Sequence, residues 1–150
     1  MYEYLLFFHI LGMAMWLGAG FALNVLMARG NSGKNPALGP ALGPEMEFFG
    51  KAVFAPLTLF VGATDAWLVA ETNTAWTEPY VLVGLAAFAI SMLMGPLWMG
   101  RNSAKLGATI AEHGPTHADV AKYRARLKGG AIFLLLVLVV TTYFMVVKPG

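Results

Sequence analysis

Four long apolar stretches dominate this chain of 150 residues: 4–27, 52–70, 80–99 and 129–147. Each is long enough to cross the hydrocarbon core of a bilayer as a helix, which takes about 20 apolar residues. The last stretch is apolar on every side, whereas a helix of a soluble bundle keeps a charged outer face. The sequence therefore predicts an all-α membrane protein, with residues 1–150 forming one antiparallel four-helix transmembrane bundle.

Positive charges gather in two of the three loops. Of the ten Lys and Arg residues, only Lys148 lies outside the first loop, the third loop and their flanks. Because cytoplasmic loops carry the excess of Lys and Arg, we expect both termini outside, an N-out/C-out topology, in a bacterial-type inner (cytoplasmic) membrane. The positive residues then mark the cytoplasmic side of the membrane. The net charge of +2 therefore does not indicate a nucleic-acid partner, and we expect none. The nine loop charges are Arg29, Lys34, Lys51, Arg101, Lys105, Lys122, Arg124, Arg126 and Lys128.

The third loop, residues 100–128, is too long for a simple turn. We expect a helical extension from Arg101 to Ala111, a break at Gly114-Pro115, and a new helix whose N-cap is Thr116. The second helix combines a short apolar stripe with the basic cluster at 122–128. Such a helix favours the anionic lipids of the inner leaflet, which are an expected partner besides the bilayer itself.

Prolines mark three further irregular points. Pro56 is expected in the first turns of the second span, where a missing backbone N–H costs least or gives a kink. Gly95-Pro96 is expected to bend or loosen the cytoplasmic end of the third span. The Gly- and Pro-rich repeat at 36–44 reads as an irregular spacer in the first loop.

Two titratable side chains lie well inside the predicted spans, His9 in the first and Asp65 in the second. Because these helices run in opposite directions, both residues should lie roughly 8–10 Å below the outer interface, at ~1.5 Å per residue. Thr141 of the fourth span is expected in the same outer half. Ionisable residues inside a membrane usually face the bundle interior or a cavity, and they often mark a functional site.

Two interpretations of this group stay open. In the functional one, His9 binds a metal or haem iron through one ring nitrogen while Asp65 or a threonine holds the other. In the structural one, His9 and Asp65 form a hydrogen bond that fixes two helices in register. Met13 and Trp16 share a helix face with His9, and a His/Met set is a ligand set for copper(I) or a haem. Methionine is also a common apolar filler in packed helices.

Other ligand sets are weaker. His113 and His117 are four residues apart, but the breaker Gly114-Pro115 lies between them, so a solvated loop is favoured over a metal pair. The chain has no cysteine, which excludes disulfides, thiolate metal sites and covalently attached c-type haem. No phosphate-binding loop, zinc-protease pair or nucleophile elbow is present.

Two segments resemble a known group of proteins. The run from Tyr4 to Gly12, followed by Trp16-Leu17-Gly18-Ala19-Gly20, is similar to the first helix of copper-resistance D-type proteins and bacterial membrane protoporphyrinogen oxidases. The ending from Tyr143 to Gly150, with the four-span layout, resembles a related family of small predicted integral membrane proteins of unknown function. The resemblance implies that His9 matches a histidine tied to b-type haem. It supplies no second ligand and no oxidase active site.

These observations leave three hypotheses for function. The first is a membrane protein that binds b-type haem or a related redox cofactor through His9, near Met13, Trp16, Asp65 and Thr141, for electron transfer. The second is a non-catalytic accessory subunit that docks on a membrane protein partner or on a second copy of itself. The third is copper or proton handling through His9, Asp65 and Met13.

Overall fold

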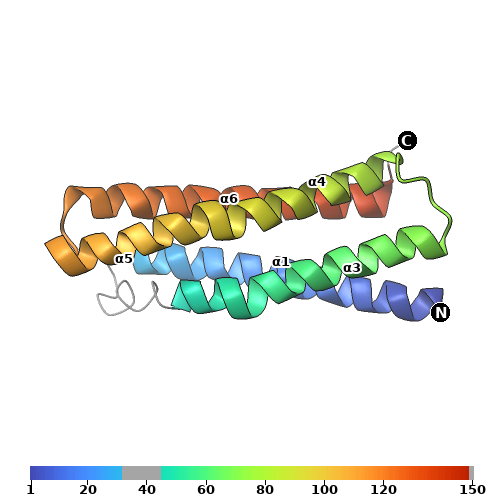
Figure 1. Cartoon of the computed structure of the whole chain (residues 1–150), viewed down its shortest axis with the longest axis horizontal. Helices are drawn as coiled ribbons and strands as arrows, with labels where there is room; N and C mark the ends of the chain where they lie inside the picture. The colour runs from blue at the N-terminus through green and yellow to red at the C-terminus, as the bar shows by residue number, and fades with distance from the viewer. Residues whose placement is uncertain (32–44, 149–150) are drawn as a thin grey trace.

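The computed structural model describes residues 1–31 and 45–148, and its regular structure is entirely helical. Four helical rods run side by side, and each is antiparallel to the one before it in the chain (Figure 1). The first rod is α1 (Tyr2–Asn31); the second joins η1 (Phe49–Phe54) to α3 (Ala55–Glu71); the third joins α4 (Pro79–Leu93), η2 (Met94–Gly100) and α5 (Arg101–His113); the fourth is α6 (Ala118–Val147). The predicted fold class is confirmed.

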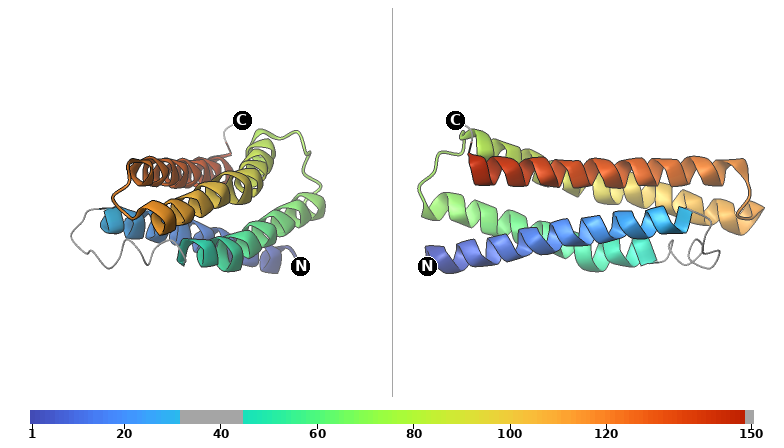
Figure 2. Two further views of the ribbon diagram at one scale, coloured as in Figure 1. Left: turned by 60° about the vertical axis from the view of Figure 1, so that its left-hand side comes forward. Right: turned by 180° about the vertical axis from the view of Figure 1, so that it is seen from behind.

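The rods close into a ring. Helix α1 packs on α3 and α6, while α4 packs on α3 and α6 from the other side. Figure 2 shows the same pairing from the side and from behind. Both described chain ends lie at one end of the bundle, here called the terminal end, and the α5–α6 turn lies at the opposite end, here called the basic end (Figure 1). Lys34 and the repeat at 36–44 lie outside the described residues.

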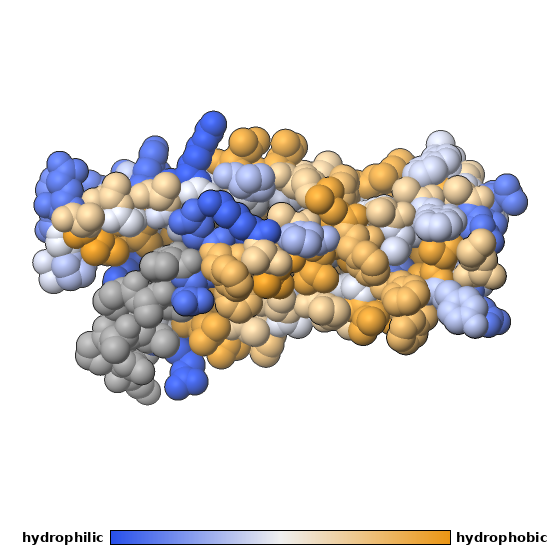
Figure 3. Space-filling model, turned by 60° about the horizontal axis from the view of Figure 1, so that its bottom comes forward, coloured by the Kyte–Doolittle hydropathy of each residue, from blue (hydrophilic) through white to orange (hydrophobic). Residues whose placement is uncertain are grey.

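All four rods are long and apolar enough to cross a membrane. They extend beyond the predicted spans, because they run over Tyr2–Gly30, Glu45–Glu71, Pro79–His113 and Ala118–Val147. Figure 3 shows the consequence on one face, where a broad apolar band separates two polar ends. Large apolar side chains of the membrane-spanning helices are exposed, for example Phe21, Leu136 and Val140. An exposed apolar band of this kind is the surface that lipid chains cover.

The helix is wider than an α-helix just before Pro56 and around Pro96. The segments η1 and η2 are π-helical, and the Ala55 N–H bonds to the Gly50 carbonyl five residues back. Proline lacks the N–H for an α-helical bond, and its ring collides with the carbonyl four residues earlier. A π-turn relieves this conflict without ending the helix. The loosened end at Gly95-Pro96 is therefore confirmed. Pro56 lies beyond the first turns of its rod, because helix precedes it from residue 45, and the helix is locally distorted just before it.

The third loop is a tight helical hairpin at the basic end. Helix α5 continues the third rod as expected, and it ends at Gly114, whose φ of 83° suits a residue without a side chain. The predicted N-cap at Thr116 is wrong, because the Nδ1 of His117 accepts the hydrogen bond from the Asp119 N–H at 3.3 Å. Helix α6 then runs unbroken through the basic cluster into the membrane segment.

The buried centre of the bundle is small. Trp16, Val61 and Leu138 form its apolar core, and Met13 packs against them with other partly buried side chains. Helix α3 packs tightly against Gly12 of α1, where an added Cβ would lie 2.9 Å from the Phe60 ring. Lipid is as apolar as this core, so close packing and interhelical hydrogen bonds, rather than the hydrophobic effect, hold such helices together.

Candidate intramembrane proton site

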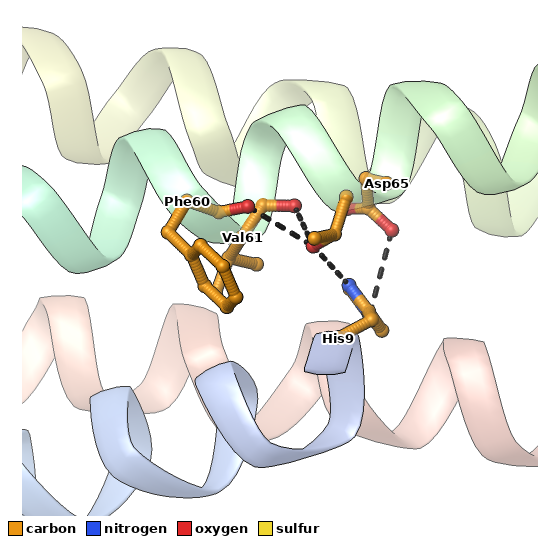
Figure 4. A network of polar contacts seen from close by, with 5 residues as sticks. His9, Phe60, Val61 and Asp65 are labelled. Atoms are coloured by element: carbon orange, nitrogen blue, oxygen red, sulfur yellow. Dashed lines mark hydrogen bonds and ion pairs between the residues drawn. The ribbon is translucent and has the colours of Figure 1, made fainter. Parts of the chain in front are cut away.

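His9 is held between two side chains of helix α3. It lies on α1 and is 6% exposed. Its Nδ1 is 3.2 Å from the Thr64 Oγ1, and its Nε2 is 3.5 Å from the Asp65 Oδ1. Figure 4 shows the imidazole ring pointing from α1 toward α3, with Asp65 on one side of it. The predicted meeting of His9 and Asp65 at one depth is confirmed.

Thr64 connects the ring to the backbone of its own helix. Its hydroxyl reaches two carbonyl oxygens, those of Phe60 at 3.0 Å and Val61 at 2.9 Å (Figure 4). A hydroxyl carries one hydrogen but accepts as well as donates. Thr64 can therefore donate to a carbonyl while it accepts from Nδ1, or it can donate to Nδ1 instead. The Thr64 hydroxyl can act as donor to Nδ1 or as acceptor from Nδ1–H without moving its oxygen atom.

The site has two schemes of protonation that differ by one proton. In the first, the Thr64 hydroxyl donates to Nδ1 of a neutral His9, and Nε2–H faces the ionised Asp65 Oδ1 at 3.5 Å. In the second, Nδ1–H donates to Thr64, whose hydroxyl donates to a carbonyl of Phe60 or Val61. A further proton then lies between Nε2 and Oδ1, on one or the other. The heavy-atom positions are compatible with both schemes.

The remaining predicted site residues are placed differently. Met13 and Trp16 belong to the apolar core described above. Thr141 is buried, and its hydroxyl donates to the Val137 carbonyl of its own helix at 2.8 Å. The structure thus brings His9 and Asp65 together and assigns hydrogen-bonding or packing contacts to the other three. A ligand role for Met13, Trp16 or Thr141 stays a prediction.

Sequence reasoning missed Thr64. Depth along the membrane points to a threonine of the fourth span, such as Thr141, as the partner of His9. Depth says nothing about the direction in which a helix faces. The available signal was adjacency: Thr64 and Asp65 point about 100° apart on their helix, so an imidazole placed between them meets both.

The site offers no free ring nitrogen for a metal. Both nitrogens of His9 already face a polar partner. Among residues 1–31 and 45–148, no group of three or more His, Asp or Glu side chains is arranged to hold a metal ion. A haem iron or copper ion on Nε2 would have to displace Asp65, and one on Nδ1 would have to displace Thr64. A metal ion on either ring nitrogen would therefore compete with the polar partner that this nitrogen already has.

The two other histidines lie far from this site, at the turn between α5 and α6. Their side chains are partly exposed, at 48% for His113 and 38% for His117, and their ring centroids are 4.7 Å apart. Each Nδ1 lies near a carboxylate, at 3.8 Å from Glu112 and at 3.9 Å from Asp119. The expectation that the breaker interrupts the helix between them and leaves them solvated is confirmed.

Comparison with known proteins places the chain in a family. Residues 3–149 match the family described as predicted integral membrane protein (DUF2269), so the chain belongs to that family. No curated protein and no solved structure matches it. The family match supports the resemblance to small predicted integral membrane proteins. The comparisons give no support to a relation with copper-resistance D-type proteins or protoporphyrinogen oxidases.

Proposed function

We propose that this member of the predicted integral membrane protein family binds and releases one proton at the His9–Asp65 pair, inside its membrane-spanning bundle. The observation that carries the proposal is the position of the Thr64 oxygen, within reach of both His9 Nδ1 and the Phe60 and Val61 carbonyls. This oxygen lets the site gain or lose a proton while the contact between Thr64 and His9 Nδ1 is kept, because the hydroxyl can donate to Nδ1 or accept from it.

The cost of charge in a membrane explains why such a device is needed. An ionised side chain within the hydrocarbon region costs at least about 2.5–3.5 kcal/mol when it is unpaired. The protonated pair is neutral overall, whether as an ion pair or as two neutral groups, and the deprotonated pair carries one negative charge. Proton binding therefore changes the net charge of the bundle interior by one. Asp65 and Thr64 both lie on α3 and His9 on α1, so this charge lies at one helix interface.

The structural alternative is a fixed clamp between α1 and α3. A clamp keeps one protonation state over the whole pH range in which the protein is folded. A proton-binding pair changes state within that range. Proton counting therefore separates the two interpretations.

The test is proton uptake by purified protein in weakly buffered proteoliposomes after a pH jump, read with a pH-indicator dye. The background carries His113→Gln and His117→Gln, which removes the other two histidines. We expect this protein to take up about one proton more than the same background with Asp65→Asn. Equal uptake by the two proteins would refute the proposal. Retained helicity of the Asp65→Asn protein, by circular dichroism, is the control for folding.

A b-type haem or a copper ion on His9 stays the leading alternative from the sequence. What supports it is the burial of a histidine inside the bundle, next to Met13 of the core. The absorption spectrum of detergent-purified protein, oxidised and then reduced with dithionite, is its test. A Soret band that is lost in His9→Ala would favour haem, and metal binding without a Soret band would favour copper.

The accessory-subunit hypothesis has one favourable observation. An open apolar groove of about 450 Å³ lies between α1 and α6, and its α1 side includes the small residues Ala14 and Gly18. Small residues let a helix from another chain approach closely. Cross-linking in membranes through Gly18→Cys, in a chain with no natural cysteine, tests this hypothesis. A cross-linked dimer or hetero-complex would support it, and only uncross-linked monomer would count against it.

Anionic lipids of the inner leaflet are the partner we propose for the basic end. Exposed cations on both helices of this end are Arg101 and Lys105 on α5 and Lys122 on α6. Juxtamembrane cations of this kind each contribute about 1 kcal/mol of attraction to an anionic surface. Stronger thermal stabilisation of the protein by phosphatidylglycerol than by phosphatidylcholine would support this partner, and equal stabilisation by the two lipids would argue against it.

A further inference from the structure

We infer that protons reach Asp65 from the terminal end of the bundle, through a notch at Gly84 of α4 that the Met145 side chain of α6 closes. The inference rests on the proposed function, because it concerns the route to the same pair. Its evidence is separate: the surroundings of the second Asp65 oxygen, the side chain that covers it, and the positions of the nearest charged groups.

Asp65 is the accessible member of the pair. Its side chain is 27% exposed, against 8% for the side chain of His9. One carboxylate oxygen, Oδ1, faces the imidazole. The other, Oδ2, faces Gly84 on the neighbouring helix α4, where an added Cβ would lie 3.5 Å from it. The Cβ position that Gly84 lacks therefore lies next to Oδ2.

Met145 lies against that position. An added Cβ at Gly84 would lie only 2.6 Å from the Met145 methyl group, so this side chain occupies the volume that any larger residue would take. Methionine has three rotatable side-chain bonds and adapts readily to its surroundings. A change of rotamer withdraws the methyl group and opens the notch without moving a helix. The Met145 side chain can thus cover or uncover the position next to the Asp65 Oδ2 by a change of rotamer.

A cation lies one turn further toward the terminal end, on the same two helices. Tyr80 precedes Gly84 by four residues, and Lys148 follows Met145 by three. The Lys148 ammonium group lies 5.0 Å from the centroid of the Tyr80 ring, which is a cation–π contact. Helix α6 ends here, because Lys148 has a left-handed backbone. The notch at Gly84 therefore lies one helical turn from a charged group at the terminal end of the bundle.

The charged groups around the pair also favour the terminal end. Distances along each rod are counted here from the residues of the site, which are His9, Asp65, Gly84 and Met145. Toward the terminal end, the nearest charged residue is about 9 Å away for Glu3, Glu71 and Glu78 and about 5 Å away for Lys148, at ~1.5 Å per residue. Toward the basic end, the nearest charged residues are roughly 21–30 Å away on the same scale. These distant residues are Arg29, Lys51, Arg101 and Lys128. Water and protons need to cross a much shorter apolar distance from the terminal end, which the charge bias places outside.

Thiol labelling tests the route directly, because the chain has no cysteine of its own. We expect Met145→Cys to react with a water-soluble, membrane-impermeant thiol reagent added on the side of the termini, and not when it is added on the basic side. Val139→Cys, which is exposed to lipid on the same helix, is the control that should stay unlabelled. Labelling of Met145→Cys only from the basic side, or from neither side, would overturn the inference.

Proton kinetics give a second, independent readout. In the proteoliposome experiment, Met145→Ala should speed proton uptake by about tenfold, and Gly84→Ala should slow it by a similar factor, both with the amplitude unchanged. Unchanged rates in both variants would overturn the route while leaving the proposed function intact. Absence of Asp65-dependent uptake in the unsubstituted protein would overturn the proposed function and the route together. Rate and labelling side report the route, whereas amplitude reports the function.

Discussion

Replacement of Thr64 by valine removes the hydroxyl at the centre of the site and keeps the shape of the side chain. In the structure this hydroxyl is the partner of His9 Nδ1, at 3.2 Å across the α1–α3 interface. Interhelical hydrogen bonds in membranes are worth about 0.6 kcal/mol on average and about 1.7 at most. Measured instead as the cost of leaving a buried polar atom without a partner, the same loss is about 1–3 kcal/mol. We expect Thr64→Val to lower the free energy of unfolding by about 1–2 kcal/mol.

Thr58 is the matched control for this substitution. It is buried on the same helix, and its hydroxyl donates only to the Phe54 carbonyl of that helix, at 2.7 Å. Thr58→Val should therefore change the free energy of unfolding by less than about 0.5 kcal/mol, as for a change that leaves no interhelical partner unpaired. Thr64→Ser, which keeps the hydroxyl, should retain most of the interaction.

The assay is reversible unfolding in mixed micelles of mild detergent and sodium dodecyl sulphate, followed by circular dichroism. A double-mutant cycle between Thr64→Val and His9→Ala isolates the pair, and we expect a coupling energy of about 1 kcal/mol. A Thr64→Val protein no less stable than Thr58→Val, or a coupling energy near zero, would refute the hydrogen-bonding scheme at Nδ1.

Further predictions concern helix packing and use the same unfolding assay. Gly12→Ala should destabilise the bundle by about 1–3 kcal/mol, because the new methyl group meets the Phe60 ring at 2.9 Å. Gly18→Ala, with nothing within 4 Å, should be neutral or slightly stabilising; equal effects at the two glycines would contradict the packing described here. Asn24→Leu should cost about 0.6–1.7 kcal/mol, because the Asn24 amide donates to the Ala131 carbonyl of α6 at 3.2 Å. An Asn24→Leu protein as stable as the unsubstituted one would show that this bond contributes nothing.

The number of spans and the shared depth of His9 and Asp65 could be predicted from the sequence, whereas their contact could not. Apolar length sets which segments cross a bilayer, and the number of residues from each interface sets depth along the helix axis. His9 and Asp65 share a depth by this count, and the structure shows their side chains 3.5 Å apart. Both inferences use distance along a helix, which sequence position gives directly.

Direction around a helix axis and local backbone detail could not be predicted in the same way. Thr64 rather than Thr141 meets the imidazole because α3 turns that face toward α1, which follows from packing of all four rods. Pro56 signals a break, but the sequence does not show that a π-turn on its N-terminal side keeps the helix continuous. The N-cap at His117 rather than Thr116 differs by one residue, a common uncertainty at helix ends.

The most direct test of the central claim is the protonation state of the His9 ring nitrogens as a function of pH. Side-chain ¹⁵N NMR of histidine-labelled protein, in the background without His113 and His117, reports each nitrogen separately. We predict a hydrogen on Nε2 alone at high pH and a hydrogen on Nδ1 at low pH, with the transition shifted or lost in Asp65→Asn. A single unchanging tautomer across the folded range would show that the pair is a fixed clamp and would contradict the account.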